Sequence, residues 1–208
     1  RLGVRTWIQK GDHALVVTGH NVTLRLLLDT WFGKGALAKR IPDWIIQLDA
    51  GYLRYFLRGY WKGDGHRSYA NVKYRYPVLG FRTASKVLAV QVAQVLLRMG
   101  IVPQVRPYRQ PITSFSKGMI YHILVPFEFY NRLAGFFGVP VTERVPARFH
   151  HYYRIVGGEV WVRVDKVQRE PYSGPMYDLS VSPINSYTLN GVEAHNSEDY
   201  FFTNKAKM

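Results

Sequence analysis

The tripeptide His195-Asn196-Ser197 near the end of the sequence could cut its own backbone. The side-chain amide of Asn196 can attack its own main-chain carbonyl, which closes a succinimide and breaks the peptide bond to Ser197. His195 can donate a proton to that carbonyl or to the departing nitrogen, and the Ser197 hydroxyl can accept an acyl group. The same residues also suit a polar turn, because Asn and Ser hydrogen-bond readily to nearby backbone.

The residues before the tripeptide favour the reaction over the turn. Residues 176–181 read MYDLSV and residues 185–191 read NSYTLNG. This stretch resembles the C-terminal splicing region of inteins, in which a Tyr-Asp-Leu strand and a Tyr-bearing strand precede Asn-Gly and then His-Asn. The resemblance implies that Asp178 and His195 assist the reaction and that splicing needs no cofactor. Asn185 stands where inteins often carry a His.

A second motif lies at residues 57–65, which read LRGYWKGDG and follow a segment of helical apolar spacing over residues 49–62. The motif resembles the LAGLIDADG motif of homing endonucleases, although Lys62 stands where the first Asp usually does. In that family two such helices pack side by side, and each directs a carboxylate into one active site. The resemblance implies that Asp64 binds Mg²⁺ and helps to cleave double-stranded DNA, because the metal polarises a phosphate and activates water. A plain turn at residues 63–65 is the alternative.

An internal repeat supports the second motif. Lys10-Gly11 is followed by an apolar strand, a helix and a glycine, and the same order follows Lys117-Gly118, 107 residues later. The start of the chain is therefore interpreted as the tail of a first copy, whose Asp would lie roughly 43 residues before Arg1. Lys10 and Lys117 resemble the family's active-site lysines, which stabilise charge on the cleaved phosphate. Each also suits an ordinary turn lysine.

The order of predicted elements agrees with this resemblance. From residue 49 the pattern predicts helix, two strands, helix, two strands, helix, with Ser85 capping the middle helix. The predicted helices cover residues 49–62, 86–99 and 127–137, and the predicted strands cover residues 69–76, 78–83, 102–109 and 119–125. From about residue 149 the pattern predicts strands only, at residues 152–156, 159–169, 177–181 and 186–189. We expect an α+β fold: a LAGLIDADG-type αββαββα unit with a truncated first copy, followed by the all-β strands of a HINT-type splicing domain.

The expected boundaries follow from these patterns. Residues 1–42 form the tail of the first copy and a connector, and residues 43–147 form the second copy. Residues 148–196 form the C-terminal splicing segment, and residues 197–208 are a remnant of the host protein, the C-extein.

The chain is strongly basic, with 28 Lys and Arg against 14 Asp and Glu and a net charge of +14. Such an excess indicates a polyanionic partner, with nucleic acid ahead of an acidic membrane surface. Basic residues alternate with tyrosines along the predicted strands. In the LAGLIDADG family such strands form a saddle over the major groove, where Arg and Lys contact phosphate or read guanine. A solvated sheet face is the alternative. The candidate DNA-binding residues are Arg67, Lys73, Arg75, Arg82, Arg106 and Arg109.

Several classes of site are excluded by composition. The chain has no cysteine, so it has neither disulfides nor cysteine-rich zinc sites, and its seven histidines show no metal-ligand spacing. No apolar run approaches the ~18 residues of a membrane span, and no signal peptide is recognisable. We therefore expect a protein that is not secreted and resides in the cytoplasm, wherever its host protein resides.

The sequence as a whole is interpreted as the C-terminal portion of an intein with an embedded homing endonuclease. Its expected partners are double-stranded DNA, the host extein protein and a missing N-terminal intein segment, supplied covalently or in trans. Two alternatives remain: a DNA endonuclease whose splicing tail is inactive, and a basic interaction domain without catalysis.

Overall fold

The computed structural model describes residues 4–10, 15–69, 77–111, 118–143, 153–157, 159–164, 166–177, 179, 181–183, 185–189 and 192–195. It divides into two compact units, Arg1–Val145 and Pro146–Met208. None of the helices in the described residues has the length and apolarity needed to cross a membrane.

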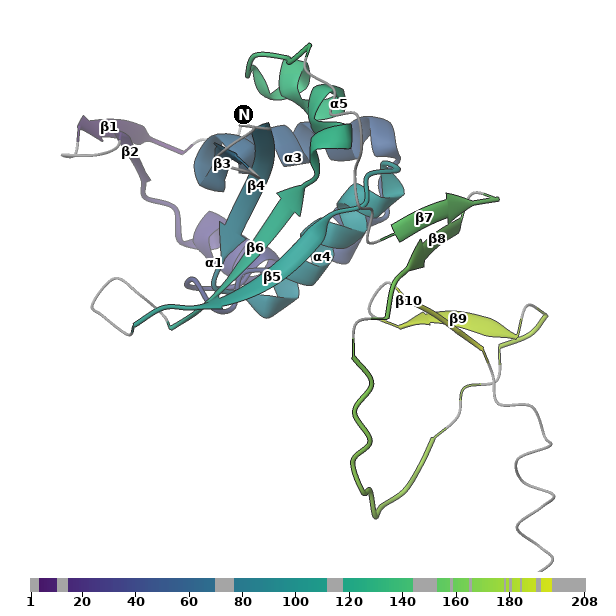
Figure 1. Cartoon of the computed structure of the whole chain (residues 1–208). Helices are drawn as coiled ribbons and strands as arrows, with labels where there is room; N and C mark the ends of the chain where they lie inside the picture. Colours follow the sequence, from purple (N-terminus) through teal and green to yellow (C-terminus); the bar gives the residue numbers. More distant parts are fainter. Residues whose placement is uncertain are drawn as a thin grey trace, which may run out of the picture. The chain divides into compact units, whose positions relative to one another are not determined.

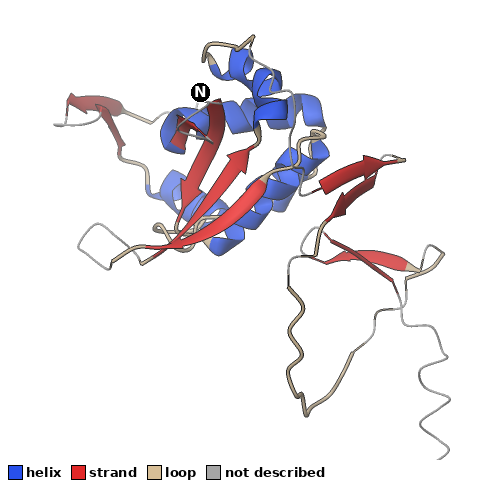
Figure 2. Ribbon diagram, in the orientation of Figure 1, coloured by secondary structure: helices blue, strands red, loops and turns tan. Residues whose placement is uncertain are grey.

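The first unit is built on a four-stranded antiparallel sheet (Figure 1). Its strands, in spatial order, are β3 (Gly65–Tyr69), β4 (Pro77–Thr83), β6 (Met119–Val125) and β5 (Gln104–Arg109). Helices α3 (Ala50–Asp64), α4 (Lys86–Arg98) and α5 (Phe127–Phe137) pack against one face of this sheet (Figure 2). The predicted order of helix, two strands, helix, two strands, helix is confirmed, and with it the α+β class of this unit.

The core lies between the sheet and these helices. Alternate side chains of β4 and β6 point into it, because strand side chains alternate between faces. Helix α3 packs on β4, and α4 packs on β6 and β4. The aromatic centre is Trp61, which packs edge-on to Phe81 at a ring distance of 5.8 Å and stacks on Phe137 at 5.0 Å. Each such large side chain, when fully buried, contributes about 1.5–3 kcal/mol. Fully buried residues of this core include Leu53, Leu57, Leu79, Phe81, Ile123 and Val125.

The segment before α3 is tied to the start of α4. The Ser85 hydroxyl accepts a hydrogen bond from the Leu88 amide at 3.1 Å, which caps α4 as predicted. The same hydroxyl donates to the Lys39 carbonyl at 2.6 Å. The Gln91 side chain bonds both backbone groups of Ile41, at 2.7 and 2.9 Å. The connector that leads into the short helix α2 (Asp43–Ile46) is therefore fixed on α4.

The N-terminal elements are a hairpin and a helix: β1 (Thr6–Lys10), β2 (Leu15–Gly19) and α1 (Val22–Phe32). Helix α1 buries none of its residues, whereas α5, its counterpart in the internal repeat, buries six. Leu26, Leu27 and Leu28 are each more than 40% exposed. In α5 the equivalent face is covered by β4 and α3. The described residues provide no such cover for α1.

The second unit contains two hairpins, β7 (Tyr153–Val156) with β8 (Glu159–Val162), and β9 (Ser186–Leu189) with β10 (Val192–His195). The strand predicted at 186–189 is confirmed. The predictions at 159–169 and 177–181 are wrong in part: β8 ends at Val162, and the described residues of 177–181 form no strand. Sequence alternation indicates a preference for extended backbone, but a strand also needs a partner for its backbone groups.

Candidate nucleic-acid interface

Asp64 lies at the junction between α3 and β3, because the helix runs through it and the strand begins at the next residue. The alternative of a plain turn at residues 63–65 is therefore wrong. A Cβ on Gly65 would lie 2.4 Å from the Trp61 carbonyl oxygen, so only glycine lets the strand leave the helix here. The result is a carboxylate fixed at the C-terminal end of the helix, as the motif implied.

The Asp64 carboxylate has a basic neighbour. The Lys39 ammonium lies 3.4 Å from it, and both side chains are nearly half exposed, at 48% and 43%. An ion pair this exposed contributes at most about 1 kcal/mol. The Lys39 backbone is nevertheless held by Ser85, so the lysine stays close to the carboxylate. Burial and then the Asp64 charge raise the pKa of the nearby Tyr60 phenol, which stays neutral.

The sequence motif predicts that Asp64 binds a divalent metal ion. No group of three or more His, Asp or Glu side chains gathers among them in a way that could hold a metal ion. Mg²⁺ is usually bound by one or two protein carboxylates together with waters and substrate phosphates. Asp64 fits the role of one such carboxylate.

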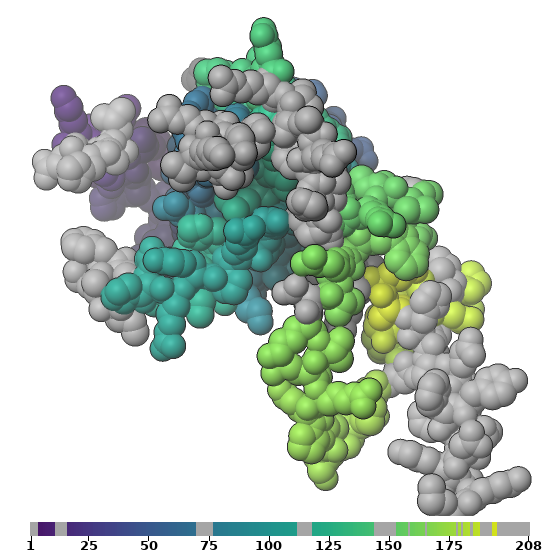
Figure 3. Space-filling view, viewed as in Figure 1, coloured from purple at the N-terminus to yellow at the C-terminus, as the bar shows by residue number. Residues whose placement is uncertain are grey.

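The sheet face opposite the helices is basic and is called the open face below. In register across β4, β6 and β5 stand Arg82, His122 and Arg106. Both arginines are exposed, and His122 is partly buried. None of the four strands contains an Asp or Glu. Figure 3 shows atoms of the teal segment that contains β5 at the molecular surface. A row of positive charge on strands that carry no carboxylate suits a phosphate backbone.

Two histidines of the open face were not predicted as site residues. The His122 ring lies 6.2 Å from that of His66 and 5.8 Å from that of Tyr108. His66 occupies the space above Gly80, where a Cβ would lie 2.6 Å from its ring, and its buried Nδ1 has no hydrogen-bond partner in the structure. Burial and the Arg82 charge lower the pKa of both histidines. Both imidazoles are therefore neutral at pH 7.

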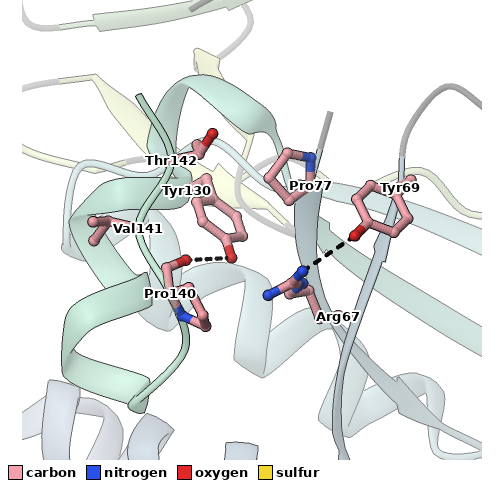
Figure 4. Close-up of a pocket in the computed structure, with 7 residues that line it drawn as sticks. All are labelled: Arg67, Tyr69, Pro77, Tyr130, Pro140, Val141 and Thr142. Carbon is pink, nitrogen blue, oxygen red and sulfur yellow. Dashed lines mark hydrogen bonds between the residues drawn. The ribbon is translucent and has the colours of Figure 1, made fainter. Parts of the chain in front are cut away.

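Arg67 lies on the other face of the sheet. It lines a cavity of about 260 Å³ beside Tyr130 of α5 (Figure 4) and donates a hydrogen bond to the Tyr69 hydroxyl at 3.1 Å. Tyr130 in turn donates to the Pro140 carbonyl at 2.8 Å. Arg109 has the opposite parity to Arg106 on β5, so it too points away from the open face.

The predicted DNA-binding residues therefore do not share one face. Arg82 and Arg106 come together on the open face, whereas Arg67 and Arg109 do not join them. Lys73 and Arg75 lie outside the described residues.

The remaining predicted site residues are only partly described. Lys10 is the exposed last residue of β1. His195 ends β10 and is paired with Ser186 of β9. Lys117, Asp178, Asn196 and Ser197 lie outside the described residues, so their predicted roles stay predictions.

A comparison with known protein families tests the resemblance to LAGLIDADG proteins. A model of LAGLIDADG-like domains matches residues 51–166, more than half of the chain. The chain belongs to the LAGLIDADG-like domain family. This membership indicates a DNA-binding function of the homing-endonuclease type, which usually uses a divalent metal. A search of curated proteins found no match.

Proposed function

We propose that this LAGLIDADG-like protein binds duplex DNA on the open face of its sheet. The observation that carries the proposal is the row of Arg82, His122 and Arg106 on the helix-free side of the family-matched sheet. Both side chains are exposed, and Arg106 donates one hydrogen bond to the Gln104 side-chain oxygen at 2.7 Å. Because a guanidinium carries five N–H groups, both arginines can form charge-assisted hydrogen bonds with phosphate or bidentate bonds with guanine. The net charge of +14 adds a sequence-independent attraction.

Cleavage is proposed to need a second unit of the same kind. Asp64 would be one of two carboxylates that hold Mg²⁺ against the cleaved phosphate, and Lys10 and Lys117 would stabilise charge on that phosphate. The exposed leucines of α1 support this arrangement, because the matching helix α5 is covered by β4 and α3. A preceding helix-strand-strand segment, in the same chain or in a partner, would cover α1 and supply the second carboxylate.

We further propose that the second unit is the C-terminal splicing element of an intein. The β9–β10 hairpin supports this idea, because its last residue, His195, directly precedes Asn196. The long segment before β9 also exposes apolar side chains: Val164, Val167 and Tyr177 are each more than 70% exposed. Such a segment suits a strand that pairs with an N-terminal splicing segment, supplied covalently or in trans.

Two alternative functions would each lack part of the activity proposed above. A DNA endonuclease with an inactive splicing tail would bind DNA but release no peptide at Ser197. A basic interaction domain would do neither. Mass spectrometry of the purified chain, incubated with and without an N-terminal splicing segment, separates the first alternative from the proposal.

The DNA-binding proposal predicts a steep dependence on salt. Each phosphate contact releases condensed counterions, so log K falls with log salt by about 0.9 per contact. Two contacts alone would weaken binding roughly tenfold between about 50 and 200 mM KCl. Fluorescence anisotropy of a labelled duplex across that range measures the slope. A flat response would contradict binding through the arginine row.

A further inference from the structure

His122 stands between two guanidinium groups at the centre of the open face. The strand register places Arg82 on one side of it and Arg106 on the other. Its imidazole is partly buried, and its ring neighbours are His66 on β3 and Tyr108 on β5. None of the four strands carries a carboxylate, so the charged side chains that they place on the open face are cations.

This environment disfavours the protonated imidazole. Burial, followed by the charge of Arg82, lowers the pKa of His122 from its ordinary value of 6.5. At neutral pH the free protein therefore presents a neutral imidazole inside a row of positive charge. The pKa is lowered by burial and by repulsion from the neighbouring cation. An anionic ligand that neutralises this cation would remove the repulsion.

A DNA backbone supplies the opposite environment. A phosphate held by Arg82 and Arg106 would offset the two positive charges beside His122. It would also provide an anionic oxygen for the N–H groups of the imidazolium, which donates from both ring nitrogens. We propose that duplex binding on the open face is coupled to proton uptake by His122, so that this residue is a pH-dependent DNA contact. The inference rests on the proposed DNA-binding function.

The direction of the pH effect follows from linkage. A group whose pKa rises on binding gives tighter binding at low pH, and this gain is lost as the pH rises through the pKa of the bound state. Between the pKa values of the free and bound protein, the complex holds one more proton than its parts. The dissociation constant then falls by up to about tenfold for each unit of pH decrease. The effect stops growing below the pKa of the free protein.

The experiment measures duplex affinity of the full chain from pH 5.5 to 8.5 at constant ionic strength. His122→Gln removes the titrating group but keeps a polar side chain. His20→Gln is the matched control, because His20 lies beside Trp7 next to the β1–β2 hairpin, outside the four-stranded sheet. We expect wild type and His20→Gln to bind more tightly as the pH falls, and His122→Gln to lose most of that gain. Thermal unfolding at both ends of the pH range checks that each protein is folded.

A second measurement needs no substitution. The imidazole carbon and nitrogen resonances of His122 can be titrated in the wild-type protein with and without duplex. A higher titration midpoint in the complex supports the inference, and equal midpoints overturn it. Parallel pH curves for wild type and His122→Gln also overturn it, while steep salt dependence at pH 8 would leave the proposed function standing. Absence of duplex binding at pH 8 and low salt would remove both.

Discussion

Asn196→Ala is expected to abolish release of the peptide that begins at Ser197. The alanine side chain has no amide to attack the main-chain carbonyl, so the succinimide cannot form. Cyclisation of an Asn that precedes a residue bulkier than glycine is slow by itself, so the fold must position the amide and transfer protons. The chain is mixed with an N-terminal splicing segment, and mass spectrometry follows both the released peptide and the succinimide at Asn196.

Two further substitutions distinguish the steps of this reaction. His195→Ala should slow release by about 10²–10⁴-fold, the usual effect of losing a proton donor. Ser197→Ala should leave release intact but block ligation, because the oxygen that accepts the acyl group is gone. If Asn196→Ala still released the peptide at the wild-type rate, the cleavage would be ordinary proteolysis and the splicing proposal would fail.

Asp64→Asn should abolish Mg²⁺-dependent DNA cleavage by a protein in which a second helix-strand-strand unit precedes residue 1. An amide is a poor replacement for a carboxylate that holds a divalent cation. Loss of groups that merely orient metal ligands already costs about 10–100-fold, so loss of a ligand itself should cost at least about 100-fold. Cleavage of a plasmid that carries the target site, followed on gels over a Mg²⁺ titration, measures the effect.

The structure offers two controls for this substitution. Lys39→Gln breaks the same 3.4 Å ion pair but keeps the carboxylate, so it should retain metal-dependent cleavage. Asp49→Asn changes a carboxylate at the opposite end of α3, where the side chain makes no capping hydrogen bond, and should also retain activity. Full activity of the Asp64→Asn protein would show that Asp64 is not a catalytic residue.

The elements of the first unit could be predicted because local signals agreed with the final packing. The cap at Ser85 and the helical apolar spacing mark α4, and the predicted strands at 78–83 and 119–125 lie within a residue of β4 and β6. The start of β3 was missed by four residues. Gly63, Asp64 and Gly65 have the composition of a turn, but burial of Trp61 continues the helix and Gly65 lets the strand begin at once.

The composition of the open face could not be predicted in the same way. Arg67 and Arg82 both lie on basic strands, yet strand register puts them on opposite faces. Register depends on long-range pairing, and a shift of one residue exchanges the faces. For the same reason His122 could not be predicted as a site residue. Its position between Arg82 and Arg106 follows only from the strand register.

The most direct test of DNA binding on the open face compares two matched variants. The measured quantity is the slope of log K for duplex binding against log salt concentration. The double variant Arg82→Gln/Arg106→Gln removes both guanidinium groups from the open face. The double variant Arg67→Gln/Arg109→Gln also removes two guanidinium groups, but from strand positions that point away from the open face. If DNA binds on the open face, the first variant loses about two units of the slope of log K against log salt, and the second keeps nearly the wild-type slope. Equal losses in the two variants, or a larger loss in the second, would contradict DNA binding on the open face.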